Sequence, residues 1–528
     1  MAQSYDYVIV GAGAAGCVLA NRLSARPELR ILLLEAGGAD SNPNIHMPAG
    51  LGRIIKNRRI NWDYRTEPEA QLLDRQLYWP RGRVIGGSTS INAMCYTRGH
   101  RRDYDEWARV AGADWAYEQV LPFFRTAEDN ENGSNEYHGH GGPLGVQNPR
   151  YTNVLSGVFV EAAAAAGFAR NADFNGATQE GVGLYQVMQR HGARCSAASA
   201  YLHPIRHQRG NLTIIARALA TRVLIENGRT VGVEYRHQGK TETARAEREV
   251  LLSCGAIATP QLLLLSGIGP AAKLDEYSIP VQVDLPEVGR NLQDHLDFCT
   301  VQQSKKAVTY EFNAAQMLVV AARYLLTRRG PGTSNIAESG GFVRSPLAVD
   351  ERPDVQFHFV PAQLDDHGRK RLPGHGYTLH ACGLRPRSRG HVTLRSAKPE
   401  DPPRIYANYL SDPFDLKVMM ESIQLSRAIL SRAPFSPYRG REVFPGEGVL
   451  ARDQIETILR RKAETIYHPV GTCRMGTDSA SVVDGALRVR GTEGLRVVDA
   501  SVMPTLIGGN TTAPTIMIAE KIAAAMLA

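Results

Sequence analysis

The sequence predicts an α/β protein, α+β overall, in which one domain is built from both chain ends and an antiparallel-sheet domain is inserted between them. Near the N-terminus, two apolar runs at residues 8–10 and 31–34 flank a glycine turn and a helix-forming segment. Fully apolar strands of this kind are typical of a buried parallel sheet. The chain from residue 495 onward repeats this pattern of an apolar strand, a glycine loop and a helix, whereas the middle part of the chain alternates polar and apolar residues.

The remaining elements follow from local patterns. Residues 211–216, 222–226 and 231–236 are β-rich runs separated by turns, which predicts a meander against the parallel sheet. A buried strand at residues 250–253 precedes a helix that we expect from about Pro260, where a Thr–Pro step gives a normal helix start.

Further along the chain, alternating runs such as residues 355–359 and 391–394 predict an antiparallel sheet with one covered face. A strand at residues 495–499, a glycine loop and a terminal helix then complete the first domain.

Length and charge limit the classes of function. A chain of 528 residues is too long for one simple core, so two or more lobes are expected. The net charge of +8 comes mainly from arginine, without a basic block or a nucleic-acid motif. We therefore expect no nucleic-acid partner, and either an anionic cofactor or a weak attraction to a membrane surface.

Cysteine usage and hydropathy bear on the compartment. The seven cysteines are scattered singly, which is typical of free thiols in a reducing cytosol. No leader-like segment precedes the strand that begins at Tyr5, and no window holds roughly 18 consecutive apolar residues. We expect a cytoplasmic protein, either free or peripheral on the inner face of the cell membrane.

The most apolar long stretch, residues 314–326, contains Gln316, Arg323 and Tyr324 and predicts an amphipathic helix. The favoured interpretation is a helix that faces the core of the second domain. A membrane-surface or lid role is the alternative.

The first motif is a glycine fingerprint. Gly11 permits a tight turn, Gly13 lets the backbone approach a pyrophosphate, and Gly16 lets the helix pack closely on the strand. Glu35 ends the next strand, where a carboxylate accepts hydrogen bonds from an adenosine ribose. The helix N-terminus adds a partial positive charge. This pattern predicts dinucleotide binding without separating FAD from NAD.

Two further segments are rich in small residues. Residues 81–93 contain Gly86, Gly87 and Ser88, whose exposed N–H groups suit a phosphate or a flavin edge, although an ordinary Gly/Ser loop would look similar. Residues 255–269 indicate, by themselves, only a close-packed helix.

These segments resemble a known family. Residues 82–99 and 255–269 are similar to the two signature sequences of the glucose–methanol–choline (GMC) oxidoreductases, and the fingerprint lies where that family has it. Residues 291–295, 467–476 and 497–504 also match, so the resemblance extends from end to end. Within the family the chain most resembles bacterial FAD-dependent alcohol dehydrogenases of alkane utilisation and choline dehydrogenases.

The resemblance implies a Rossmann-like FAD-binding domain and an inserted antiparallel-sheet substrate-binding domain. We expect the FAD-binding domain to comprise residues 1–155, 191–304 and 461–528, and the substrate-binding domain to comprise residues 156–190 and 305–460.

The resemblance also implies the site. His468 would act as the general base, and Asn510 as its partner, offering an amide N–H to the substrate oxygen. The terminal helix would start beside the flavin, with Thr511 or Thr512 as its cap and Pro514 in its first turn. No metal is expected. The residues expected to contact FAD are Gly11, Gly13, Gly16, Glu35, Gly86, Gly87, Ser88, Asn92, Asp499 and Ala500.

Some family members attach FAD through a histidine directly before this asparagine of the glycine–serine loop. Ile91 occupies that position, so we expect non-covalent FAD. His358 lies in an alternating strand and is either a core histidine or a substrate-pocket residue, and Tyr467 could line the pocket. Choline would need an aromatic cage, which the sequence does not show, so uncharged alcohols are favoured.

The implied activity is the oxidation of a primary aliphatic or aromatic alcohol to the aldehyde by hydride transfer to flavin N5, with electrons passed to a quinone-type acceptor. The alternatives are an alcohol or choline oxidase or dehydrogenase that uses oxygen or another acceptor, and a hydroxynitrile-lyase-type enzyme without net redox chemistry. A non-catalytic FAD-binding protein is a further alternative.

Overall fold

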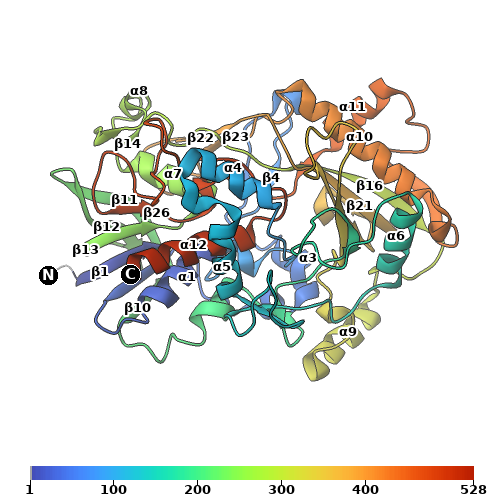
Figure 1. The fold of residues 1–528 in the computed structure, drawn as a ribbon, viewed down its shortest axis with the longest axis horizontal. Coiled ribbons are helices and arrows are strands. Elements are labelled where there is room, and N and C mark those ends of the chain that lie inside the picture. Colours follow the sequence, from blue (N-terminus) through green and yellow to red (C-terminus); the bar gives the residue numbers. More distant parts are fainter. Residues whose placement is uncertain (1–2) are drawn as a thin grey trace.

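The computed structural model describes residues 3–528, and the side chains of all of these except residues 3, 367 and 371. Its elements form two lobes that lie side by side along the long axis of the molecule (Figure 1). Both chain ends lie in the lobe around the first sheet, so this lobe is indeed closed by the two ends of the chain. The mixed α/β class and the inserted antiparallel sheet predicted from the sequence are confirmed.

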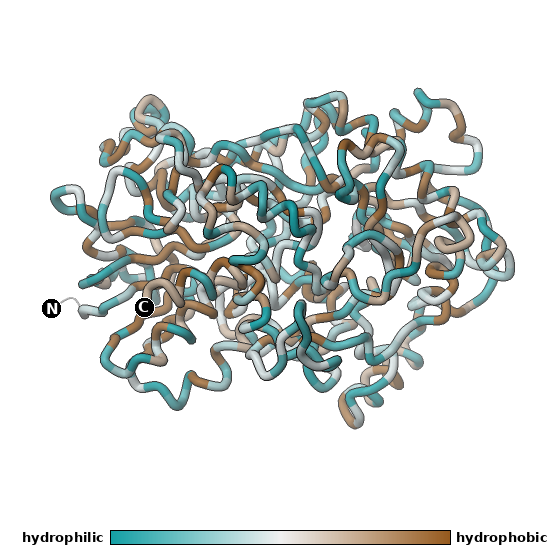
Figure 2. The backbone as a smooth tube through the Cα atoms, viewed as in Figure 1, coloured by the Kyte–Doolittle hydropathy of each residue, from teal (hydrophilic) through white to brown (hydrophobic). Residues whose placement is uncertain are grey.

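The first sheet has seven strands around a parallel core. Strand β1 (Gln3–Val10) lies between β2 (Ile31–Glu35) and β13 (Lys240–Leu252), and pairs with both in parallel. On the other side of β13, β26 (Leu495–Val497) adds a C-terminal parallel strand. All five residues of β2 are buried, as the apolar run predicts, and the strands appear as hydrophobic segments in Figure 2. The first helix is α1 (Ala14–Leu23).

The meander differs from the prediction in one strand. Strand β10 (Leu212–Ala216) pairs in parallel with β2 and extends the core of the sheet, so it does not belong to the meander. The antiparallel meander is formed by β11 (Ala218–Glu226), β12 (Arg229–His237) and β13.

Helix α7 (Gly255–Leu265) begins five residues before Pro260, so the predicted start at the Thr–Pro step is wrong. A proline inside a helix removes the N–H that would bind the carbonyl four residues earlier. Here that carbonyl belongs to Ala256, and the Thr472 hydroxyl donates to it at 2.6 Å. A distant side chain therefore satisfies the group that Pro260 leaves free, which no local pattern could reveal.

The second sheet also has seven strands and is mainly antiparallel. Its path runs through β24 (Arg439–Phe444), β16 (Leu296–Ser304), β21 (Gly376–Gly383), β18 (Val355–Val360), β17 (Ser339–Val343) and β7 (Gly181–Leu184), with β25 (Glu464–Thr465) beside β16. Strands β16 and β25 thus lie in this sheet, although the expected boundaries at residues 304 and 461 placed them with the first domain.

The expected single covered face of this sheet is wrong, because all six residues of β18 are buried. Phe357 and Phe359 pack in a cluster with Phe159 of α6 (Val154–Ala165). The alternate residues Gln356 and His358 point to the other side of the strand, where His358 lines a cavity. Strand β22 (His391–Thr393) is not part of this sheet and pairs only with β23 (Arg404–Tyr406).

Two long helices differ sharply in how much of their surface is buried. Helix α12 (Thr512–Leu527) is buried along most of its length beside α1. Helix α9 (Ala314–Thr327), in contrast, buries only Tyr324. The interpretation of this segment as a core-facing helix is therefore wrong. None of the helices that the structure describes combines the length and apolarity that crossing a bilayer requires.

Candidate active site

A first cavity lies over the glycine fingerprint, and we call it the glycine-loop cavity. It has a volume of about 180 Å³ and is lined by both glycine loops, Glu35, Asp499 and the start of α12. A Cβ added at Gly16 would lie 1.8 Å from the Gly11 carbonyl oxygen, so this position requires glycine for packing. A Cβ added at Gly13 would meet only the Ser253 carbonyl oxygen, at 3.8 Å, and would otherwise occupy the cavity.

The N-terminus of α1 faces this cavity without a side-chain cap, because its N-cap residue is Gly13. Unpaired N–H groups at a helix N-terminus are a ready site for a phosphate group. The residues present therefore fit a dinucleotide pyrophosphate.

Glu35 fixes the turn between the two strands. Its carboxylate accepts hydrogen bonds from the N–H groups of Ala12, at 2.9 Å, and Gly37, at 2.7 Å. Burial raises the pKa of Glu35 to about 7, although these two N–H groups act in the opposite direction. Glu35 lines the glycine-loop cavity, so its position is compatible with a ribose.

The second glycine loop closes against the first. Gly86 N donates to Ala12 O at 2.7 Å, and a Cβ at Gly87 would lie 2.7 Å from the Gly13 Cα. Gly86 and Gly87 both have positive φ, at 92° and 54°. Ser88 accepts a hydrogen bond from the Gly82 N–H and borders this cavity and the next.

Asp499 and Ala500 lie on the opposite wall of the glycine-loop cavity. Asp499 Oδ2 accepts hydrogen bonds from Gly255 N, at 2.8 Å, and Thr259 Oγ1, at 2.6 Å, while Oδ1 accepts one from Ser501 N. Burial raises the pKa of Asp499. These contacts show Asp499 as the residue that ties the start of α7 to the C-terminal loop.

A second cavity, which we call the histidine cavity, adjoins the first and has a volume of about 360 Å³. Arg81, Ser88, Thr511 and Thr512 line both cavities. The wall is mostly apolar, with polar groups that include His468 and Asn510. The larger aliphatic and sulfur-containing lining residues are Leu51, Ile55, Ile91, Met94, Cys95, Ile336, Val360, Leu364 and Ile466.

His468 and Asn510 meet in the wall of the histidine cavity, and their chain neighbours Pro469 and Thr511 line the glycine-loop cavity. His468 Nε2 lies 3.1 Å from Asn510 Nδ2, and both residues line the histidine cavity. The backbone N–H of His468 donates to Asp294 Oδ1 at 2.7 Å, which fixes the loop that carries the imidazole. Burial lowers the pKa of His468 well below its usual range, so the ring is neutral and able to accept a proton.

A second histidine determines which His468 nitrogen can accept a proton. His295 Nδ1 lies 3.0 Å from His468 Nδ1, and His295 Nε2 lies 3.3 Å from the Leu384 carbonyl oxygen. A carbonyl can only accept, so His295 carries its proton on Nε2 and accepts on Nδ1. His468 then carries its proton on Nδ1, which leaves a lone pair on Nε2. Burial lowers the pKa of His295 to about 3, which keeps it neutral.

Asn510 is oriented by two residues from other elements. Thr97 Oγ1 and Gln356 Nε2 both lie 3.1 Å from Asn510 Oδ1, and Asn510 N donates to Thr97 Oγ1 at 2.9 Å. With its oxygen held in this way, the amide directs its NH₂ group toward His468. Sequence reasoning missed the roles of Thr97, Gln356 and His295. Thr97 and His295 lie in segments that the family resemblance marks, but the resemblance gave them no role, and Gln356 lies in no such segment.

The two predicted pocket residues also line the histidine cavity. His358 stacks on Tyr185 with 5.3 Å between ring centroids, and its Nδ1 has no hydrogen-bond partner among the described residues. Burial lowers the pKa of His358 to about 4. Tyr467 is half-buried with φ of 74°, and its carbonyl oxygen accepts a hydrogen bond from Arg81.

The glycine–serine loop ends at the histidine cavity. Ile91 lines that cavity and is 5% exposed. Asn92 Nδ2 donates to Thr512 Oγ1 at 3.2 Å, and Asn92 Oδ1 accepts from Arg194. Thr511 is the N-cap of α12 but makes no capping hydrogen bond through its side chain, contrary to expectation. The positive end of α12 therefore remains open to the cavities.

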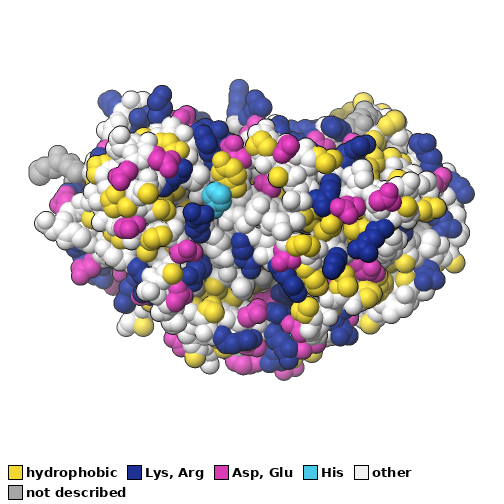
Figure 3. All heavy atoms as spheres, turned by 90° about the horizontal axis from the view of Figure 1, so that it is seen from above, with side chains coloured by type: hydrophobic (Ala, Val, Ile, Leu, Met, Phe, Trp, Pro, Cys, Tyr) yellow, Lys and Arg dark blue, Asp and Glu magenta, His cyan; other side chains and the backbone are white. Residues whose placement is uncertain are grey.

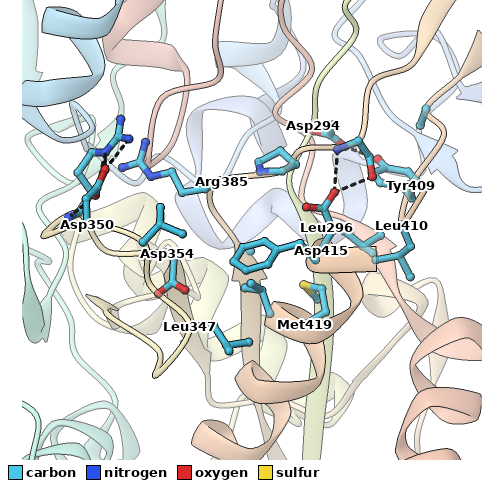
Figure 4. Close-up of a pocket in the computed structure, with 18 residues that line it drawn as sticks. Asp294, Leu296, Leu347, Asp350, Asp354, Arg385, Tyr409, Leu410, Asp415 and Met419 are labelled. Atoms are coloured by element: carbon cyan, nitrogen blue, oxygen red, sulfur yellow. Dashed lines mark hydrogen bonds and ion pairs between the residues drawn. The ribbon is translucent and has the colours of Figure 1, made fainter. Parts of the chain in front are cut away.

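A third, smaller cavity of about 80 Å³ lies between the second sheet and helix α10 (Pro413–Leu430). Figure 4 shows apolar side chains such as Leu296 and Met419 beside Asp354 and Arg385. Neither His468 nor Asn510 lines it. This cavity therefore lacks the pair of groups that could act on a hydroxyl.

Comparisons with known proteins agree with this arrangement. Family models described as GMC oxidoreductase match residues 5–297 and 386–519. The chain is 51% identical over 526 residues to an alcohol dehydrogenase [acceptor] of Pseudomonas putida, covering 98% of this chain and 95% of that protein.

Mitochondrial choline dehydrogenase of Mus musculus is 45% identical, over 99% of this chain and 89% of that protein. Among solved structures, pyridoxine 4-oxidase from Mesorbium loti superposes with a TM-score of 0.91 at 33% identity, over 99% of each chain.

Proposed function

Because this chain belongs to the GMC oxidoreductase family, we propose that it oxidises an uncharged primary alcohol, aliphatic or aromatic, to the aldehyde. The cofactor is FAD, which we propose is bound non-covalently because Ile91 offers no side chain for a covalent link. The observation that carries the proposal is the approach of His468 Nε2 and Asn510 Nδ2 to 3.1 Å in the wall of the histidine cavity.

Each residue of the site has a separate role in this reaction. FAD, when bound in the glycine-loop cavity, supplies the hydride acceptor. His468 Nε2 accepts the hydroxyl proton, and Asn510 Nδ2 donates a hydrogen bond to the same oxygen as charge develops on it. His295 holds His468 in the required tautomer. The apolar walls exclude water, which strengthens these interactions.

The charge of the histidine cavity supports an uncharged substrate. Among its described lining residues there is no aspartate or glutamate, and Tyr467 is the only aromatic ring apart from the histidines. Arg81 adds a half-buried cation to the wall. Behind His380, which lines the cavity, lies the carboxylate of Asp297, whose Oδ2 is hydrogen-bonded to His380 Nδ1 at 2.7 Å. A trimethylammonium group would thus meet neither a carboxylate nor an aromatic cage.

The test compares two alcohols that differ in charge alone. The enzyme is reduced anaerobically with 3,3-dimethyl-1-butanol or with choline, in which a nitrogen cation replaces the quaternary carbon, and the flavin absorbance is followed. We expect bleaching with the neutral alcohol and with benzyl alcohol, and at least about tenfold slower bleaching with choline. Faster reduction by choline would overturn the substrate class. Flavin that stays oxidised with every alcohol would favour a lyase.

We further propose that electrons pass to a quinone-type acceptor, with the enzyme peripheral on the inner face of the cell membrane. The support is the similarity to an alcohol dehydrogenase [acceptor]. Steady-state rates with oxygen and with a soluble quinone analogue distinguish this proposal from the oxidase alternative. A rate with oxygen that equals or exceeds the quinone rate would contradict it.

A further inference from the structure

Helix α9 presents apolar side chains to solvent. Leu318, Val319, Leu325 and Leu326 are 71%, 66%, 69% and 84% exposed. Figure 1 shows the helix protruding from the edge of the molecule, and Figure 2 shows hydrophobic segments in it. Exposed apolar groups that gather on one element commonly mark an interaction site.

These side chains share one face of the helix. Successive helical residues are about 100° apart, so Leu318 and Leu325 lie close to one direction and Val319 and Leu326 about 100° from it. Tyr324 lies on the opposite side, where it is buried and its hydroxyl donates to the His46 carbonyl oxygen at 3.0 Å. The helix is therefore attached through one face and presents its apolar face outward.

The surroundings of α9 are basic. Residues 41–62 and 312–337 contain no aspartate or glutamate. The two segments are neighbours, since the turns at Pro48–Gly50 and Pro331–Thr333 are in contact. Within the part of the chain that the structure describes, their exposed basic residues with no carboxylate in an ion pair are Arg53, Lys56, Arg59, Arg323, Arg328 and Arg329.

Other surfaces of the protein are different. The face shown in Figure 3 intermingles Lys and Arg with Asp and Glu. The region around α9 thus combines an outward apolar helix face with an excess of positive charge, which is the pattern of helices that lie in the interface of an anionic bilayer.

The same surface borders the histidine cavity, and we place the opening of the cavity here. Leu51, Gly52 and Ile55 line that cavity, and Gly52 is exposed. Arg53 and Lys56 belong to the same short segment and are exposed. A bilayer in contact with this surface would therefore face the opening, so that an apolar alcohol or a quinone could move between lipid and cavity without crossing water.

We propose that α9 and the basic segment 51–59 dock the enzyme on an anionic lipid bilayer, with the opening of the histidine cavity toward the lipid. The apolar face of α9 enters the interface, and the arginine and lysine side chains contact lipid phosphates. The value of this orientation for catalysis rests on the proposed function, whereas the docking itself rests on α9 and its charges.

The test measures sedimentation of the holoenzyme with vesicles of phosphatidylcholine, with and without phosphatidylglycerol. We expect binding to the anionic vesicles that weakens in high salt. The double variant Leu325→Ser/Leu326→Ser should reduce the partition coefficient at least about tenfold, because each leucine loses most of its transfer free energy. Arg323→Gln/Arg329→Gln should reduce it about tenfold or more on anionic vesicles and little on neutral ones.

The matched control is Leu450→Ser, which removes a leucine that is 74% exposed outside these segments. It should bind vesicles as the wild type does. Equal loss of binding in this control, or no binding by the wild type, would overturn the proposal. So would a dimer in light scattering that the α9 variants dissociate, since a second copy would then cover the helix.

Flavin reduction by a water-soluble alcohol without vesicles separates the two proposals. The α9 variants should keep the wild-type rate in this assay. An enzyme that binds vesicles but is reduced by no alcohol would contradict the proposed function and leave the docking surface in place.

Discussion

The contact between His468 and Asn510 predicts a measurable coupling. His468→Ala should slow flavin reduction about 10²–10⁴-fold, the usual contribution of a general base, or about 3–5 kcal/mol. Asn510→Ala removes a hydrogen bond to an oxygen that gains charge, which is worth about 1.5–3 kcal/mol, or about 10–10²-fold. Because the two groups lie 3.1 Å apart and act on one oxygen, the double variant should be slower than His468→Ala by less than about tenfold.

The assay is anaerobic stopped-flow reduction of wild type, both single variants and the double variant by one primary alcohol. FAD content is measured for each, and should not change because neither side chain lines the glycine-loop cavity. His391→Ala is the control, since this histidine lines neither cavity. A His468→Ala enzyme with a near wild-type rate would refute the assignment, and losses that multiply fully in the double variant would refute the shared oxygen.

Four further predictions concern the cofactor, the tautomer and the pH profile. Gly13→Ala should fold but lose FAD, whereas Gly16→Ala should lose the fold because its Cβ meets backbone; circular dichroism and flavin content distinguish them, and full occupancy in Gly13→Ala would contradict the fingerprint. Acid precipitation should release flavin into the supernatant because Ile91 forms no covalent link, and flavin in the pellet would be inconsistent with this. His295→Gln keeps a group that can accept from His468 Nδ1 and donate to the Leu384 carbonyl, so it should retain more of the reduction rate than His295→Leu. Since burial lowers the pKa of both histidines, the wild-type rate should stay level from about pH 8 to 6.5, and only His295→Leu should change this profile.

The sequence predicts the first lobe well where local chemistry determines it. The turn at Gly11 and the apolar run of β2 specify a parallel unit through backbone freedom and burial, and both are local properties. The start of α7 could not be predicted, because the Thr472 hydroxyl that satisfies the Ala256 carbonyl comes from a distant part of the chain. The exposure of α9 could not be predicted from the sequence either, because an apolar helix has the same residue pattern whether its apolar face contacts a core or solvent.

The site shows the same limit. Periodicity and spacing select His468 only as a histidine in a loop, and the family resemblance assigned its role. The structure then places it beside Asn510. Thr97 lies in the signature-like segment 82–99 and Gln356 lies in β18, but neither pattern reveals that these residues orient the amide. That role arises only when the Thr97 loop, β18 and a loop from the chain end converge.

The protonation of the buried histidines connects the mechanism to the choice of substrate. Burial lowers the pKa of His295 to about 3 and that of His358 to about 4, and it lowers the pKa of His468 well below its usual range. A neutral His468 is available as a base, but it becomes a cation once it accepts the hydroxyl proton. A fixed positive charge on the substrate about 5 Å away would then raise the energy by about 3 kcal/mol at an effective dielectric constant of about 20. An enzyme for a cationic alcohol would need a carboxylate in the cavity wall to offset this repulsion, and here the nearby Asp297 is bonded to His380. The burial that keeps His468 neutral thus also disfavours cations and leaves uncharged alcohols as the substrates that the cavity accommodates.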